Sequence, residues 1–183
     1  IAYTSISHFG FIVLGIFAFT SQSLTGSTLY MLNHGMSTAA LFVIAGFLIK
    51  RRGSRDINAY GGVDRVAPVL AGLLLFAGLS TLSLPGLSSF VSEFMVLAGT
   101  FGRHPAYAVI STLAIVLAAL YILIMYQRTM TGPISDEVRD SVTELNGRER
   151  LAMAPLVVLI LLLGVFPKPM LSIIEPSTQA TMQ

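Results

Sequence analysis

Five long apolar stretches, separated by short polar connectors, are the feature that most constrains how this chain can fold. They cover approximately residues 3–20, 28–48, 67–101, 106–126 and 151–167. A helix needs about 20 mostly apolar residues to cross the hydrocarbon core of a bilayer, at about 1.5 Å per residue. The sequence therefore predicts an all-α, polytopic transmembrane helix bundle with five spans.

Charged residues are too few for a typical water-soluble domain. They make up 11% of the 183 residues, against about 25% in an average soluble protein. The chain has no cysteine and only three histidines, so we expect no metal site. The basic residues form short clusters rather than one positive surface, so we expect no nucleic-acid binding. The chain begins with Ile1 and shows no signal peptide, and we interpret it as a piece of a longer membrane protein.

The distribution of Lys and Arg predicts the orientation in the membrane. With five spans, connectors 49–66 and 127–150 lie on the same side, and they carry nine of the eleven basic residues. The other two are Arg103 and Lys168. Basic connectors stay in the cytoplasm, so the chain is predicted to end on the outer side. Connector 127–150 mixes acids and bases, which is typical of a solvated loop that can include a short surface helix.

The third apolar stretch is about 35 residues long, well beyond what one crossing needs. Pro85 in its middle cannot donate a backbone hydrogen bond and clashes with the preceding turn, while Gly86 adds backbone freedom. Serines and threonines around this pair can hydrogen-bond the freed carbonyls. The pattern predicts a discontinuous helix of two halves, which in carriers points to a transport site. The alternative is a tilted, proline-kinked helix without such a function.

Glu93 is the only carboxylate inside the five predicted spans. It lies about seven residues after the break, roughly 10–12 Å below the outer surface at 1.5 Å per residue. A charged side chain at that depth costs about 3 kcal/mol or more, so we expect Glu93 to face the protein interior, where it can load and release a proton. Ser89, four residues earlier on the same face, and the adjacent Ser92 are candidate supports. The alternative is a neutral, hydrogen-bonded structural glutamate.

Two histidines, His8 and His34, lie inside predicted spans, and polar side chains neighbour each of them. The neighbours that we single out around His34 are Tyr30, Ser37 and Thr38. An imidazole can take a proton at one nitrogen and lose one at the other, so both histidines are candidates for a hydrated proton path. The alternative is that they only hold helices together. Gly35 and Ala39 predict close helix packing beside His34.

Three segments carry a resemblance to a known family. They are IAYTSISHFGF at residues 1–11, NHGMSTAALF at 33–42 and LPGLSSFVSEF at 84–94. Together they resemble the antiporter-like subunits of respiratory complex I, and most closely the M type, also called chain 4. Segments 55–56, 61–62 and 166–171 are similar to the same type. Ser92 departs from the glycine that the family commonly has before the glutamate, but the carboxylate itself is retained.

The resemblance implies a subunit built from two inverted repeats, of which this chain would be the second half. His8 and His34 would belong to a central axis of ionisable residues and water. Glu93 would be the charged residue of the second broken helix. A partner glutamate and two key lysines of the family would lie upstream of this chain.

The function implied by the resemblance is proton translocation by a membrane-arm subunit of respiratory NADH:quinone oxidoreductase. Other subunits would bind the flavin, the iron–sulfur clusters and the quinone, so we expect no cofactor and no redox chemistry in this chain. Its partners would be the other membrane-arm subunits, especially the L and N types, and the lipid of a bacterial cell membrane. Two alternatives remain: a subunit of a multisubunit cation/proton antiporter, and a structural membrane subunit without a proton path.

Overall fold

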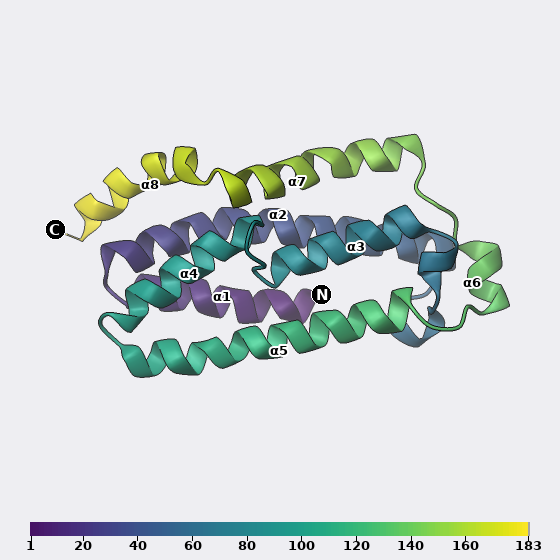
Figure 1. Ribbon diagram of the computed structural model, residues 1–183, viewed down its shortest axis with the longest axis horizontal. Coiled ribbons are helices and arrows are strands. Elements are labelled where there is room, and N and C mark those ends of the chain that lie inside the picture. Colours follow the sequence, from purple (N-terminus) through teal and green to yellow (C-terminus); the bar gives the residue numbers. More distant parts are fainter. Residues whose placement is uncertain (183) are drawn as a thin grey trace.

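The computed structural model describes residues 1–182 and, over these residues, consists of helices with no strand (Figure 1). Most of the helices run along the long axis of an elongated bundle, and α2 contacts α1, α3, α4, α7 and α8. The α-helices are α1 (Ala2–Phe17), α2 (Ser21–Arg52), α3 (Pro68–Thr81), α4 (Ser88–Phe101), α5 (Pro105–Met130), α6 (Asp136–Ser141), α7 (Gly147–Val165) and α8 (Lys168–Thr181). Two short 3-10 helices, Ile57–Ala59 and Val63–Arg65, precede α3. The predicted all-α fold is confirmed.

Only some of these helices meet the length and hydropathy of a membrane span. Within the described residues, α2 and α5 qualify alone. The number rises to four if two bent helix pairs each count as one span: the segment Ile57–Arg65 with α3, bent by 115°, and α7 with α8, bent by 69°. Helices α1 and α4 are apolar but shorter. The count of five spans therefore stays a prediction.

Helix α2 begins seven residues before the apolar stretch that predicted it. Thr20 caps its N-terminus by accepting a hydrogen bond from the Ser23 backbone at 3.1 Å. The added turns are polar but mostly buried from Ser23 onward, because they pack on other helices. The Ser27 hydroxyl, for example, donates to the Ile12 carbonyl at 2.6 Å. Glycines allow this close packing, since a Cβ at Gly99 would lie 2.5 Å from the Ser23 nitrogen. Hydropathy alone therefore underestimates the length of α2.

The third apolar stretch is broken between α3 and α4, as predicted. Helix α3 ends with Leu84 N–H donating to the Leu79 carbonyl and Ser83 N–H donating to the Ser80 carbonyl, which is the Schellman pattern. The chain then turns through Pro85 and Gly86, whose φ of +94° fits the third position of a type II turn. Helix α4 starts directly after this turn.

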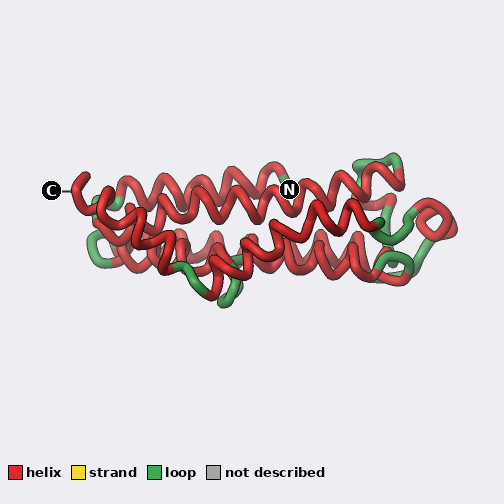
Figure 2. The backbone as a smooth tube through the Cα atoms, turned by 90° about the horizontal axis from the view of Figure 1, so that it is seen from above, coloured by secondary structure: helices red, strands yellow, loops and turns green. Residues whose placement is uncertain are grey.

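A second break, between α7 and α8, was not predicted as a helix-to-helix bend. The sequence Phe-Pro-Lys-Pro at 166–169 was interpreted as the end of the last span, and α7 does end at Val165. However, proline suits the first turn of a helix, where no N–H partner is needed, and α8 starts there. Both breaks lie near each other along the bundle (Figure 2). Gly164 of α7 touches the turn itself, because a Cβ there would collide with the Gly86 carbonyl.

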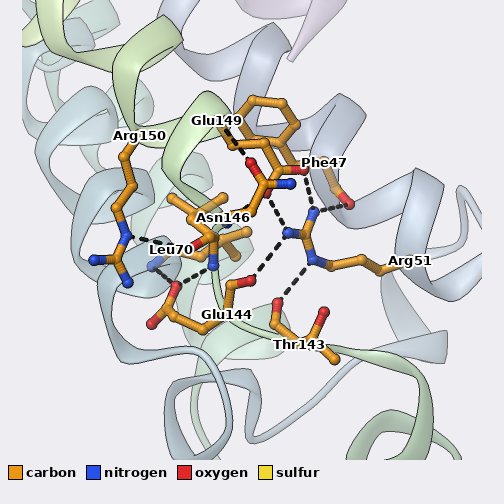
Figure 3. A network of polar contacts seen from close by, with 9 residues as sticks. Phe47, Arg51, Leu70, Thr143, Glu144, Asn146, Glu149 and Arg150 are labelled. Atoms are coloured by element: carbon orange, nitrogen blue, oxygen red, sulfur yellow. Dashed lines mark hydrogen bonds and ion pairs between the residues drawn. The ribbon is translucent and has the colours of Figure 1, made fainter.

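Arg51, in the last turn of α2, holds one end of the bundle together (Figure 3). Its guanidinium donates to both carboxylate oxygens of Glu149 in α7, at 2.5 and 3.1 Å. It also donates to the backbone carbonyls of Thr143, at 2.7 Å, and Glu144, at 3.2 Å. The pair Arg51–Glu149 is only about one-tenth exposed on either side. This arrangement ties the connector after α6 to α2.

The same connector caps two further helices. The Glu144 carboxylate accepts from the backbone N–H groups of Val69 and Leu70, at 2.6 and 3.2 Å, at the start of α3. Asn146 and Glu149 form a capping box at the start of α7. A negative side chain at a helix N-terminus is favourable because the helix dipole is positive there. Helix α6 precedes these residues within segment 127–150, where the sequence allowed a short helix.

Candidate functional site

The two predicted histidines face each other across α1 and α2. The ring centroids of His8 and His34 are 5.2 Å apart, and the side chains are 3% and 7% exposed. The antiparallel hairpin of α1 and α2, closed by the Thr20 cap, brings them together although they are 26 positions apart in the sequence. Thr38, one turn after His34, lies 3.3 Å from its Nδ1.

Tyr30 joins this pair. Its hydroxyl lies 2.6 Å from Nδ1 of His8, and its ring centroid is 6.3 Å from that of His34, one helical turn away. Tyr30 is almost fully buried. Because the phenol can donate its proton to Nδ1, the neutral His8 imidazole then carries its own proton on Nε2. Tyr30 is thus both a packing residue and a hydrogen-bond partner.

Glu93 lies in α4, buried in the protein interior at 4% exposure. Over residues 1–182 it has no salt-bridge partner and makes no side-chain hydrogen bond of good geometry. The hydroxyl-bearing side chains of Tyr30, Ser83 and Tyr121 lie within electrostatic range of its carboxyl. The Glu93 carboxyl of α4 therefore lies within electrostatic range of Tyr30 of α2, the tyrosine that bonds His8.

The predicted serines form a separate set of contacts between α2 and the broken helix. Ser37 pairs with Ser80 at 2.7 Å and with Ser89 at 3.3 Å. Ser92 donates to the Ser89 carbonyl at 2.8 Å. Ser89 shares the helical face of Glu93, as expected, but its hydroxyl is directed to α2 instead of to the carboxyl. The serines thus position α4 against α2.

Asn33 was not predicted as a site residue, yet it makes the strongest polar link to α4. Its amide donates to the Ser88 carbonyl at 2.6 Å and to the Ser92 hydroxyl at 3.1 Å. Ser83 and Tyr121 were also missed. Tyr121 is one of three tyrosines on the apolar helix α5. The one available signal was that a buried phenol hydroxyl needs a polar partner.

Buried polar atoms without a hydrogen-bond partner gather around this site. They are His8 Nε2, Asn33 Oδ1, Ser83 Oγ, Ser88 Oγ and Tyr121 Oη. Such groups are costly in a dry interior and are normally satisfied by another polar group or by ordered water. The cluster can therefore bind and pass on protons or water. Within the described residues, no three metal-binding side chains come together.

The close packing predicted beside Gly35 is not found among residues 1–182. Gly35 was expected to pack closely against a neighbouring helix, but a Cβ there would meet nothing within 4 Å. Gly35 instead borders a groove of about 440 Å³ between α1 and α2, which His34 and Thr38 also line. The close approaches among the described helices involve other glycines, such as Gly26 against Met95 and Ser92.

Known proteins resemble this chain over its whole length. It is 58% identical over 182 residues to NADH-quinone oxidoreductase subunit M of Mycobacterium tuberculosis, covering 100% of this chain and 33% of that protein. The chain thus spans about a third of the length of the curated relatives it matches. Its structure matches one chain of respiratory complex I from Thermus thermophilus with bound NADH, with a TM-score of 0.91 and 34% identity. That match covers 99% of this chain and 38% of the other.

The fold alone is shared more widely. A chain of the Mrp complex from Dietzia sp. matches with a TM-score of 0.85 at 21% identity, over 99% of this chain and 42% of the other. Residues 1–131 also match a family model whose description is NADH:quinone oxidoreductase/Mrp antiporter, transmembrane. Together with the apolar helices, these matches make the chain part of a membrane protein. It belongs to the NADH:quinone oxidoreductase/Mrp antiporter transmembrane family.

Proposed function

We propose that this chain is part of a proton-translocating membrane-arm subunit of respiratory NADH:quinone oxidoreductase, of the M type. The 58% identity to a subunit M supports this assignment. In such a complex, NADH oxidation and quinone reduction take place in other subunits, which hold the flavin, the iron–sulfur clusters and the quinone. The residues of this chain move protons and bind none of these groups.

The observation that carries the proposal is the position of Glu93. Its carboxyl is buried beside an interrupted helix, in reach of Tyr30, which hydrogen-bonds His8. An ionisable group inside a membrane protein is costly to insert and is typical of a proton relay. In the proposed path, Glu93 holds a proton and exchanges it with the hydroxyl and imidazole groups that lead to His8 and His34.

We further propose five crossings, with α3 and α4 as one discontinuous span. Segments 49–66 and 127–150, which include the adjoining helix ends, would face the cytoplasm because they carry nine of the eleven basic residues. The C-terminus would lie on the outer side of a bacterial cell membrane. This chain would be the second of two inverted repeats and would contact the L-type and N-type neighbours.

The test is Glu93→Gln in the full-length subunit of the assembled complex, reconstituted in sealed vesicles. Proton uptake per NADH oxidised should fall at least about tenfold, because the amide cannot carry the proton. Glu175→Gln, an exposed carboxylate of α8, is the matched control and should pump like the parent. An assembled Glu93→Gln complex that pumps normally would reject the role of Glu93 and favour a structural subunit.

A cation/proton antiporter without redox partners is the second candidate. The family model covers both kinds of protein, and the fold of an Mrp subunit is shared. Purifying the native complex distinguishes the two candidates. Subunits with flavin and iron–sulfur clusters should copurify with this chain; their absence from an intact complex that exchanges cations for protons would favour the antiporter.

A further inference from the structure

Ser83 has an unusual backbone for its residue type. Its φ is +57°, in the left-handed region that side chains other than glycine rarely adopt. It occupies the position after the α3 C-cap, where the Schellman pattern normally uses glycine. A glycine would fit this turn without strain, so the serine side chain has a role other than forming the turn. Strained residues of this kind concentrate at functional sites.

The hydroxyl of Ser83 is directed into the protein although the turn that follows is at the surface. Ser83 is 8% exposed, whereas Leu84 is 45% exposed. Its Oγ is buried and unpaired among the described residues. The groups that it faces are the Tyr30 hydroxyl of α2 and the Glu93 carboxyl of α4. Ser83 therefore lies between two residues of the proposed path that come from different helices.

The neighbouring serines differ from Ser83, because three of them are hydrogen-bonded and Ser88, whose hydroxyl is also buried and unpaired, lies in regular helix at the start of α4. Ser80 and Ser89 share the hydroxyl of Ser37, and Ser92 donates to a backbone carbonyl. These hydrogen bonds join Ser37 of α2 to both α3 and α4, or lie within α4. Of this group, Ser83 combines an unpaired buried hydroxyl with a backbone that costs energy to maintain.

We propose that the Ser83 hydroxyl relays protons between Glu93 and Tyr30, so that a chain of side chains connects the carboxyl to His8. This inference rests on the proposed function and adds a residue to it. The unusual backbone angle is what turns the hydroxyl inward at the point where the helix is interrupted.

The proposed relay consists of concerted proton transfers in which no proton is gained or lost. The O–H bond of the protonated Glu93 breaks and its proton bonds to Ser83 Oγ. The proton that Ser83 carried moves to Tyr30 Oη, and the Tyr30 proton moves to Nδ1 of His8, 2.6 Å away. Both hydroxyls end neutral, Glu93 becomes a carboxylate and His8 becomes an imidazolium, which can release its other proton from Nε2. The starting arrangement returns when the two hydroxyls rotate, His8 moves its remaining proton from Nδ1 back to Nε2 by exchange with water, and Glu93 takes up a new proton.

Two substitutions separate the hydroxyl from the backbone. Ser83→Gly removes the hydroxyl and relieves the strained turn, whereas Ser83→Ala removes the hydroxyl and retains the Cβ. Both are made in the full-length subunit and assayed in the assembled, reconstituted complex for proton uptake per NADH oxidised and for thermal stability. Leu84→Ala, at an exposed position in the same turn, is the control and should pump like the parent.

We expect both Ser83 variants to lose pumping on the order of tenfold, while Ser83→Gly is at least as stable as the parent. Infrared difference spectra provide a second readout. The C=O stretch of protonated Glu93, identified by its loss in Glu93→Gln, should move to higher frequency in both variants because the hydroxyl that bonds the carboxyl in the proposed relay is gone.

Normal pumping by Ser83→Gly, or an unshifted carboxyl band, overturns the relay. This outcome is distinct from failure of the proposed function. If Glu93→Gln stops pumping and Ser83→Gly does not, only the relay is wrong. If Glu93→Gln pumps normally, the role of Glu93 fails and the relay fails with it.

Discussion

The side-chain amide of Asn33 donates to the backbone carbonyl of Ser88 at 2.6 Å and so fixes the first residue of α4 to the middle of α2. The same amide reaches the Ser92 hydroxyl one turn later. The second half of the broken helix is therefore positioned by α2, not only by the turn that joins it to α3. Since Tyr30 lies on α2 and Glu93 on α4, this contact also fixes the two residues relative to each other.

Asn33→Ala should destabilise the protein by about 1–3 kcal/mol, because it removes two donated hydrogen bonds from a buried site. Thermal unfolding of the purified complex measures the effect. Asn58→Ala, at an exposed position before α3, is the matched control and should change little. Equal stability of the Asn33 variant and the parent would show that α4 does not depend on this amide.

Gly164→Ala should destabilise by about 1–3 kcal/mol, because the added Cβ meets the backbone of the turn after Gly86 and overpacking is costly. The nearest atom that must move besides the Gly86 carbonyl is the Leu87 Cα, 2.6 Å from the added carbon. Gly72→Ala in α3 has open space around it and should be neutral or slightly stabilising, because alanine is the better helix former. Thermal unfolding of both variants distinguishes packing from helix propensity.

Acid should weaken the end of the bundle that Arg51 holds. Hydrogen bonds from Arg51 lower the pKa of Glu149 below its ordinary value of 4.5. A carboxylate with a lowered pKa contributes stability that is fully present above that ordinary value and is lost as the pH falls through the folded-state pKa. We expect the melting temperature of the parent to fall below about pH 4.5, and Glu149→Gln to show a flatter acid dependence and a lower melting temperature at pH 7.

Glu137→Gln is the control for this pH experiment. Glu137 pairs with Arg52, but its side chain is 73% exposed, and exposed ion pairs contribute about 0–1 kcal/mol. Its acid profile should follow that of the parent. If Glu149→Gln and Glu137→Gln have the same profile as the parent, the Arg51 contacts do not stabilise the fold.

The helix break could be predicted because its cause is local. Pro85 and Gly86 interrupt an apolar run that is too long for one crossing, and the structure breaks at that place. The bend after α7 has an equally local signal, but the prolines at 167 and 169 both end one helix and suit the start of another. A sequence pattern cannot decide between these roles, which depend on whether the following residues find a helix to pack on.

The ionisable members of the candidate site were the easiest to predict. Glu93 and His34 are conspicuous because charge and imidazole are rare in apolar stretches. Ser83 and Tyr121 are ordinary residue types, and their significance comes from contacts between helices distant in the sequence. Gly35 shows the opposite error: its spacing from Ala39 is typical of close packing, yet the residue borders an open groove.

Helix α7 is held in place at two points. At one end Gly164 packs against the backbone of the turn at Gly86, and at the other end Glu149 forms a salt bridge with Arg51. An α-helix resists changes in length, so neither anchor can be displaced without pushing or pulling on the other. We therefore expect a change in the shape of this turn to shift α7 and, with it, the contacts at Arg51, and we expect a ligand or neighbour that displaces the Arg51 contacts to act back on the interrupted helix.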